Sequence, residues 1–566
     1  MTEQAHELLD PTQAGISVPT PSRSVHAAPS VSTDANALAR NTNSPSPTIR
    51  NPAPAPPSPS GSNPDDNGED NNRNSDSNGS ANNRNSDPNG TATVDQYPQF
   101  SRPREALLVL VLLYSQLITQ AGITQGVFTI NSIGETFGIR DISLSWTVSA
   151  YALTIGTFIL CAGRLGDLFG HKRMYLVGCA WLVFGSLLAG ISHYGDFIFF
   201  AVCRGLQGLG PAFLLPNGMA ILEKSFAPGV RQAVILALYG ASASTGAIMG
   251  ALFSSLLAQL ASWEWAYYLC AIVSALVGLL CFFVIPMDEM PDRKMSFDYW
   301  GTPLQVTGLV LFMVAWNQAP NVGWHTPYVY VFVIIAVLLL AAFFWVETKV
   351  SCPLVPISLL DRRVTLTLAC IACGWGSFGI WVVYITQLLL NLRHQTLLLA
   401  TAQITPLVVS GLIASVLTGF LLTRRIPVAL MLTIALTAFL ACSILLATMP
   451  VEQDYWAQTF VSFVLIPFGI DMSIPAAIFM VNTSIPHKHQ GMAAALVTTV
   501  VNCSISVALG IAGTVVTATS PGQTLEALTT AMHNAALVGV GLSGLGVVGA
   551  LVTTGFELFV KSASGV

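Results

Sequence analysis

The amino-acid sequence predicts an all-α integral membrane protein, a bundle of fourteen transmembrane helices. Of its 566 residues, 52% are hydrophobic and only 9% are charged, whereas soluble globular proteins carry roughly 25% charged residues. From residue 104 onward the chain is a series of apolar runs, and a membrane-spanning helix needs about 20 such residues. The runs lack the alternation of strands, and unpaired backbone is too costly in hydrocarbon, so we expect helices. The net charge of −5 argues against a nucleic-acid partner.

Basic residues predict the orientation of the bundle. If the N-terminus is cytosolic, sixteen Lys and Arg residues fall in or beside the inner connections and only two in the outer ones. This bias is typical of cytosolic loops, so an even number of spans with both termini in the cytosol is expected. The plasma membrane is the expected location. The predicted spans are approximately 106–129, 145–163, 175–192, 197–221, 232–257, 266–286, 301–318, 328–346, 366–390, 397–421, 427–449, 456–483, 491–517 and 535–559.

An internal repeat divides these spans into two halves. GPAFLLP at 210–216 and GIDMSIP at 469–475 each place Gly six residues before Pro, in the fourth and the twelfth span. Spans one to six and nine to fourteen are therefore predicted to be pseudo-symmetric, a layout that binds substrate near the midplane. The resulting organisation is a disordered cytosolic tail over 1–103, a six-helix half over 104–286, a two-helix insertion with flanking loops over 287–363, a second half over 364–560 and a short cytosolic C-terminus over 561–566.

The most specific motif is the loop GRLGDLFGHKR at 163–173, here named the gate loop. Its glycines allow helix ends to approach closely, and an Asp beside several cations can form a breakable charge lock. The loop resembles the signature loop of the major facilitator superfamily. The resemblance implies that the loop is a conformational gate that does not bind substrate. Its matching residues are Gly163, Asp167, Gly170, Lys172 and Arg173.

Two further motifs resemble the same family, in its fourteen-helix drug:proton antiporter branch. Arg204 lies in RGLQGLG, similar to a motif whose Arg is associated with proton coupling. Gly246 and Gly250 remain from an antiporter motif of the fifth span that otherwise departs from the family pattern, and they are expected to pack helices. The glutamine-rich first span lacks the usual acid and resembles a fungal subgroup that includes aminotriazole-resistance and low-affinity ammonium transporter proteins.

Only two charged side chains lie well within a span, and such residues mark function by default. Asp471 is either a proton or cation site that loads and unloads during transport, or a structural residue. Arg204 is either a cavity-facing charge or a clamp on carbonyls and Gln207. Asp167 and Glu347 are expected at helix ends that water reaches. The polar residues expected to line a substrate cavity are Gln116, Gln120, Gln125, Gln387, Gln403, Asn482 and Asn502.

These observations predict a secondary active transporter, driven by protons, that exports drugs or fungal secondary metabolites. The alternative is a transporter of a small polar or charged solute such as ammonium or borate, and a third is a non-transporting membrane sensor. No GxxxxGK[ST], HExxH or GxSxG motif occurs, which disfavours an ATP-driven pump and an enzyme. No cofactor and no metal site are expected, and the transporter is expected to act as a monomer in the lipid bilayer.

Overall fold

The computed structural model describes residues 101–139, 142–227, 230–286, 297–350, 353–355, 357, 360–424, 426–484, 490–519 and 524–564. Of the tail that is predicted to be disordered, only residues 101–103 lie within these ranges. They belong to the end of the tail that enters the first helix, which begins at Arg102. Every regular element among the described residues is a helix.

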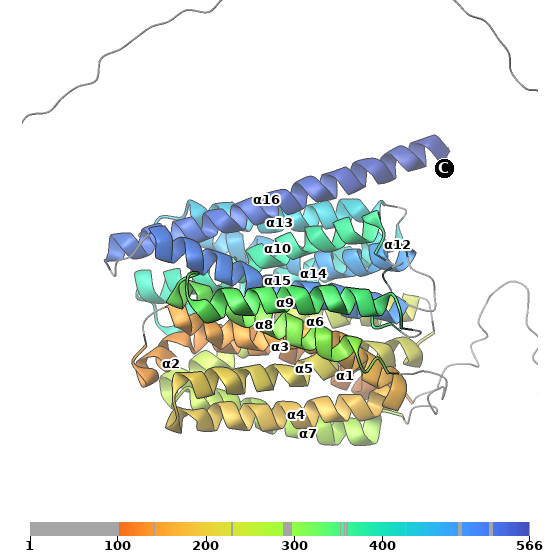
Figure 1. Ribbon diagram of the computed structural model, residues 1–566, viewed down its shortest axis with the longest axis horizontal. Coiled ribbons are helices and arrows are strands. Elements are labelled where there is room, and N and C mark those ends of the chain that lie inside the picture. The colour runs from red at the N-terminus through yellow and green to blue at the C-terminus, as the bar shows by residue number, and fades with distance from the viewer. Residues whose placement is uncertain are drawn as a thin grey trace, which may run out of the picture. The chain divides into compact units, whose positions relative to one another are not determined.

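The first half of the bundle consists of α1 to α7. Helix α1 packs along α6, α5 packs between α3 and α4, and α4 also contacts α7, which lies beside it at one edge of the bundle in Figure 1. The bounds are α1 Arg102–Phe128, α2 Ile130–Phe137, α3 Trp146–Phe169, α4 His171–Ile191, α5 Phe197–Ser225, α6 Val230–Leu260 and α7 Glu264–Val284, with short 3-10 turns at Ile142–Ser145 and Ser192–Tyr194.

Two helices, α8 (Gly301–Val322) and α9 (Pro327–Glu347), form the predicted insertion and pack against each other. Helix α8 is less apolar than the other spans, and its polar side chains bond to neighbouring helices. Gln305 donates to the carbonyl of Thr157 on α3 at 2.9 Å, and Asn317 donates to the hydroxyl of Ser506 on α15 at 2.8 Å. These bonds keep the amides away from lipid, where an unpaired polar group is costly.

The second half repeats the arrangement with α10 to α16. Helix α13 packs against α14 and α16, and α10 packs against α15 and α16; α16 and α13 lie at the edge opposite α4 and α7 in Figure 1. The bounds are α10 Arg362–Gln387, a π-helical turn Leu388–Leu392, α11 Leu397–Ile404, α12 Pro406–Thr423, α13 Val428–Ala447, α14 Gln458–Ser484, α15 Gln490–Thr519 and α16 Leu525–Ser564.

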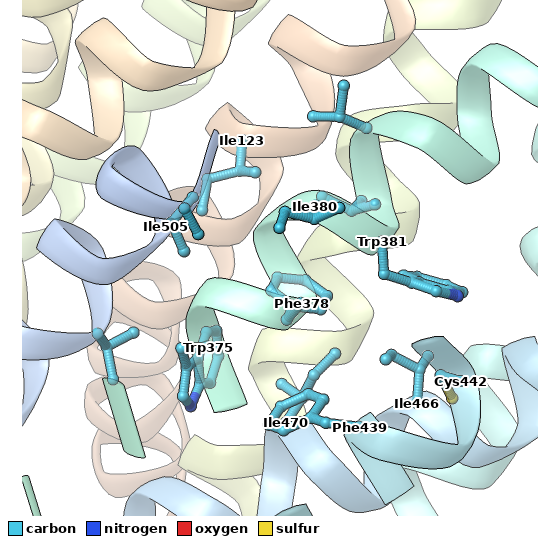
Figure 2. Packing of buried hydrophobic residues seen from close by; sticks show 14 of the residues in the cluster. Ile123, Trp375, Phe378, Ile380, Trp381, Phe439, Cys442, Ile466, Ile470 and Ile505 are labelled. Carbon is cyan, nitrogen blue, oxygen red and sulfur yellow. The ribbon is translucent and has the colours of Figure 1, made fainter. Parts of the chain in front are cut away.

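The halves meet where α3 packs on α15 and where α6 packs on α11, α12 and α14. One apolar cluster runs through this contact and contains residues of both halves. Figure 2 shows Ile123 of α1 and Ile505 of α15 in this cluster, together with Trp375, Phe378 and Trp381 of α10. We use "gate-loop end" for the end of the bundle that carries residues 163–173, and "opposite end" for the other.

The predicted fourteen-helix membrane fold with two halves is confirmed. Thirteen helical segments of the described residues are long and apolar enough to cross a membrane, and α8, which is not among them, coincides with the predicted span 301–318. One predicted limit was wrong. The predicted span 397–421 agrees with the segment Leu397–Leu422, within which Pro406, which lacks an amide hydrogen, starts a new helix after Thr405. The last helix begins at Leu525, ten residues before the predicted residue 535. The prediction followed the apolar run alone, whereas a helix can extend beyond the lipid with polar residues at its end.

Candidate functional site

Arg204 lies on α5 and is fully buried. Its guanidinium donates to the carbonyl of Thr147 on α3 and to the carbonyl of Gly122 on α1, both at 2.8 Å, and to the side-chain oxygen of Gln207. One arginine therefore ties together three helices of the first half. Two roles were predicted for Arg204. This geometry matches the second of them, a clamp on backbone carbonyls and Gln207.

Two aromatic rings complete the surroundings of Arg204. The guanidinium carbon lies 4.7 Å from the ring centroid of Tyr151 and 5.5 Å from that of Tyr267 on α7. A cation over an aromatic face is stabilised by the quadrupole of the ring. Sequence reasoning missed these two tyrosines, because they lie on α3 and α7, far from Arg204 along the chain.

Asp471 lies near the middle of α14 and is also buried, with 3% of its surface exposed. Its Oδ2 accepts a 2.8 Å hydrogen bond from the hydroxyl of Ser244, which lies near the middle of α6 in the other half. A Cβ placed on Gly411 of α12 would lie 3.1 Å from the same oxygen, so the backbone of α12 closes over it. Oδ1 of Asp471 is buried and has no hydrogen-bond partner among the residues that the structure describes.

The two membrane charges therefore occupy different environments. Arg204 lies within the first half, whereas Asp471 lies at the contact between the halves, and the ion pairs of the described residues include neither of them. Within the described part of the chain, no hydrogen-bond donor reaches Oδ1 of Asp471. Sequence reasoning missed Ser244, although it lies inside the small-residue motif that contains Gly246.

The seven amide side chains that were predicted to line a substrate cavity do not lie together in the structure. Gln125 is buried, donates to the carbonyl of Ala266 at 2.9 Å and accepts from Gln207 at 3.4 Å, so it extends the Arg204 cluster. Asn502 of α15 donates to Thr498 of its own helix, close to Gly156 of α3. The remaining five are Gln120, buried on α1, the half-buried Gln116 and Gln387, Asn482 two residues before the end of α14, and Gln403 of α11.

Gln403 lies on α11, one of the helices through which the second half contacts α6. It lines a shallow recess at the opposite end with Tyr455 and Trp456, and its carbonyl accepts a 2.7 Å hydrogen bond from the hydroxyl of Tyr455. Its side-chain oxygen is buried without a partner. The structure thus places Gln403 in a recess at the opposite end, on a helix that belongs to the contact between the halves.

In the gate loop, Asp167 is half exposed and its partners lie on its own segment. Its carboxylate is 3.9 Å from Arg164 and 3.6 Å from His171. The positive φ of 96° at Gly170 makes the sharp turn from α3 into α4, and Gly163 lets α3 approach Pro216 of α5. Asp167 therefore has a local cationic partner in Arg164, of the kind that a charge lock needs.

The two adjacent basic residues at the end of the gate loop, Lys172 and Arg173, have unlike environments. Lys172 is buried and donates to the carbonyls of Phe282 and Ile285 at 2.9 and 2.6 Å, which are the last carbonyls of α7 and favour a cation. Arg173, the next residue, is exposed. The gate loop thus holds the end of α7 through Lys172.

Glu347 is a correction to the sequence analysis, because water does not reach it. It is 3% exposed, and its two carboxylate oxygens accept from the amides of Leu354 and Val355, both at 3.1 Å. The chain after α9 folds back over the carboxylate of Glu347. The carboxylate oxygens thereby serve as hydrogen-bond acceptors for these buried amides. Asp298, also buried, accepts from the amide of Gly301 at 2.8 Å nearby.

Gly246 and Gly250 lie where α6 crosses α1. A Cβ at Gly246 would lie 2.7 Å from the Cα of Leu117, and one at Gly250 would lie 2.6 Å from the Cα of Ala121. The two helices approach so closely that no larger residue fits at either position without a shift of backbone.

Two six-helix halves around a shared apolar contact, with a buried carboxyl between them, are the architecture of a membrane transporter built from two repeats. The chain belongs to the Major Facilitator Superfamily, whose model matches residues 110–511. A peptide transporter structure, POT in complex with sulfate, shares the fold with a TM-score of 0.59 and 13% identity, covering 81% of this chain and 96% of that one.

Three fungal relatives are similar over most of their length. The chain is 48% identical to a low affinity ammonium transporter of Saccharomyces cerevisiae, over 75% of this chain and 84% of that protein. It is 40% identical to efflux pump terJ of Aspergillus terreus, over 72% of this chain and 80% of that protein. It is 36% identical to the aminotriazole resistance protein of S. cerevisiae, over 73% of this chain and 78% of that protein. The predicted membership of this family and its fungal subgroup is confirmed.

Proposed function

We propose that this protein exports amphipathic organic compounds in exchange for protons, acting as a monomer in the plasma membrane with both termini in the cytosol. The observation that carries the proposal is the hydrogen bond between Ser244 and Asp471, which joins the halves at mid-depth of the bundle. Basic residues lie in the gate loop and in the other connections at the gate-loop end. They support a cytosolic location of that end and of both termini.

The burial of Asp471 supports the coupling to protons. A carboxylate in the membrane interior costs at least roughly 2.5–3.5 kcal/mol on insertion scales, and protonation removes that charge. Contact between the halves and proton binding at Asp471 therefore favour each other. When the halves separate and water enters, the carboxyl can release its proton, which links the gradient to the motion.

The apolar cluster between the halves supports amphipathic substrates. It brings Ile123 and Val127 of α1 together with Phe378 and Trp381 of α10, and apolar and aromatic walls with few polar groups are typical of sites for organic ligands. Efflux pump terJ and the aminotriazole resistance protein, both relatives of this chain, carry names that fit this class.

Ammonium is the second candidate substrate. It is favoured by the 48% identity to a low affinity ammonium transporter, a higher identity than to terJ. Buried aromatic rings and a single carboxylate would also suit so small a cation.

The proposal is tested in proteoliposomes that contain the purified full-length protein and an imposed pH gradient. Wild-type protein should accumulate a fluorescent amphipathic compound only when the gradient is present. Asp471→Asn should abolish this accumulation while leaving the thermal unfolding curve in place, and Asp471→Glu, which keeps an ionisable group, should retain part of it. Gradient-driven transport by Asp471→Asn at the wild-type rate would reject the coupling role.

A further inference from the structure

Two residues of the short segment after α9 lie where the halves meet at the gate-loop end. Leu354 and Val355, here named the clasp, are buried, with 3% and 5% of their surface exposed. They belong to one apolar cluster with Leu160 near the end of α3, Phe343 of α9 and Ala495 near the start of α15. Helices α3 and α15 form one of the contacts between the halves. The clasp therefore connects the two-helix insertion to both halves.

Glu347, the last residue of α9, anchors the clasp. Its Oε1 accepts a 3.1 Å hydrogen bond from the amide of Leu354, and its Oε2 accepts one of the same length from the amide of Val355. Both oxygens of one carboxylate thus hold two consecutive backbone groups. The position of the clasp therefore depends on where the carboxylate of Glu347 is held.

A second buried carboxyl group, that of Asp298, lies beside Glu347. Its Oδ1 accepts from the amides of Trp300 and Gly301 at 3.2 and 2.8 Å. Its Oδ2 is buried and has no hydrogen-bond partner among the residues that the structure describes. A Cβ placed on Gly301 would overlap Oδ2 of Asp298 and lie 3.0 Å from Oε1 of Glu347. These two oxygens are therefore less than about 5 Å apart, a separation at which like charges disfavour each other.

No ion pair of the described residues neutralises the two carboxylates. Helices α8 and α9 pack on each other, and α8 also packs on α3 and α15. Apart from the pair itself, the titratable groups within these four helices are tyrosines, cysteines and two charged residues near the end of α3. The described charged residues at the gate-loop end of these helices and of the following α10 are Arg164, Asp167, Lys349, Asp361, Arg362 and Arg363.

One shared proton satisfies both requirements of this pair. Two ionised carboxylates at this separation repel each other, and burial strengthens the effect. If Oδ2 of Asp298 carries a proton, its O–H can donate to Oε1 of Glu347, which removes one charge and gives the unpartnered oxygen a bond. The remaining oxygens already accept from backbone amides, so the arrangement has a place for one proton.

We propose that Asp298 and Glu347 hold one proton between them and control the clasp, so that the pH on the gate-loop side sets how readily the halves separate there. When the proton leaves to water, both carboxylates are ionised and Glu347 moves away from Asp298 with the two amides that it holds. Leu354 and Val355 then lose their place between α3 and α15. Acidic conditions therefore keep the clasp closed, and rising pH loosens it.

Asp298 and Glu347 are positioning residues in this scheme, because they act through the clasp and touch no substrate. The halves can separate at the gate-loop end only if α3 and α15 part, and the clasp must then leave at least one of them. This device lies apart from Asp471 and from the apolar cluster that is proposed to receive substrates.

Hydrogen exchange of the purified full-length protein, followed by mass spectrometry, tests the clasp without a substrate. The protection of the peptide that contains Leu354 and Val355, corrected for the intrinsic exchange rate, should fall by at least about tenfold between about pH 5 and pH 9, the range in which buried carboxyl groups titrate. A peptide from the middle of α13 is the internal reference and should keep its protection. Unchanged protection of the clasp across this range would overturn the proposal.

Two variants separate the shared proton from a purely structural role. In Asp298→Asn the side-chain amide donates to Glu347 at every pH, so the protection of the clasp should vary by less than about twofold. In Glu347→Gln the amide donates to Asp298 and one clasp amide loses its acceptor, so protection should be low and independent of pH. Asp361→Asn, which changes an exposed carboxylate at the start of α10, is the matched control and should keep the wild-type profile. A wild-type profile in Asp298→Asn or in Glu347→Gln would overturn the proposal.

A distance measurement tests the opening of the halves. Spin labels at Arg173→Cys and Arg424→Cys, both at exposed positions of the gate-loop end, report the separation of the halves in an otherwise cysteine-free protein. The population with the longer distance should increase with pH in the wild-type background and stay constant with Asp298→Asn. A distance distribution that does not change with pH, or changes equally in both backgrounds, would overturn the control of opening. Neither measurement involves a substrate or Asp471, so a negative result leaves the proposed function in place.

Discussion

The hydroxyl groups of Ser255 on α6 and Thr401 on α11 lie 2.6 Å apart and join the two halves at the opposite end of the bundle. Two further hydrogen bonds accompany this contact. Asn131 donates to Asn391 at 2.6 Å, and the amide of Leu398 donates to Gln259 at 3.3 Å. The structure thus holds the halves together at the end away from the gate loop.

The contact between Ser255 and Thr401 predicts a reversible block of transport. The double variant Ser255→Cys with Thr401→Cys should form a disulfide under mild oxidation, because the two side chains already meet, and transport should then stop until a reductant is added. The measurement is transport before and after oxidation, with gel mobility after proteolysis between the halves. Ser254→Cys with Thr401→Cys is the matched control, since adjacent helical residues face different directions. Full transport in the crosslinked protein would show that this contact need not open.

Gly246 and Gly250 predict a stability effect that depends on helix packing. Gly246→Ala or Gly250→Ala should lower the free energy of unfolding by about 1–3 kcal/mol, because the added methyl group meets the backbone of α1. Gly544→Ala on α16 is the control, since a Cβ there meets nothing within 4 Å, and it should be neutral or stabilising by up to about 1 kcal/mol. Thermal unfolding of the purified variants measures both. Equal effects at all three positions would reject the packing role.

Arg204→Lys separates the two roles that the sequence left open for Arg204. A lysine keeps the charge but lacks the planar fork that reaches Thr147, Gly122 and Gln207, so the free energy of unfolding should fall by about 1.5–3 kcal/mol. Arg424→Lys, at an exposed arginine, should change it by less than about 0.5 kcal/mol. The measurement is chemical or thermal unfolding in detergent together with transport. Unchanged stability with lost transport would show a coupling role instead.

Lys172 and Arg173 are neighbours with different expected roles. Lys172→Met should lower the free energy of unfolding by about 1.5–3 kcal/mol, because the carbonyls of Phe282 and Ile285 lose a charged donor. Arg173→Met, at an exposed position, should stay within about 0.5 kcal/mol of wild type. Protease sensitivity of the segment after α7, compared between the two variants, provides a second measurement. Similar destabilisation by both substitutions would contradict the special role of Lys172.

The amino-acid sequence by itself determined the fold class, the helix positions, the two halves and the family. These properties depend on local quantities that can be read along the chain: the length of an apolar run, the side of the membrane that receives basic residues, and the spacing of Gly, Asp and Arg in the gate loop. Both charges within the membrane, Arg204 and Asp471, were also visible, because a charge in an apolar run needs no structure to be noticed.

Only the tertiary structure decided what surrounds those charges. Ser244 and Asp471 are 227 residues apart, and their contact exists because α6 of one half packs on α14 of the other. The burial of Glu347 and Lys172, and the unpartnered oxygen of Asp471, likewise depend on which segments fold over them. Hydrogen bonds and desolvation act over a few ångströms in space, and the packing of the helices sets those distances between residues that the sequence keeps far apart.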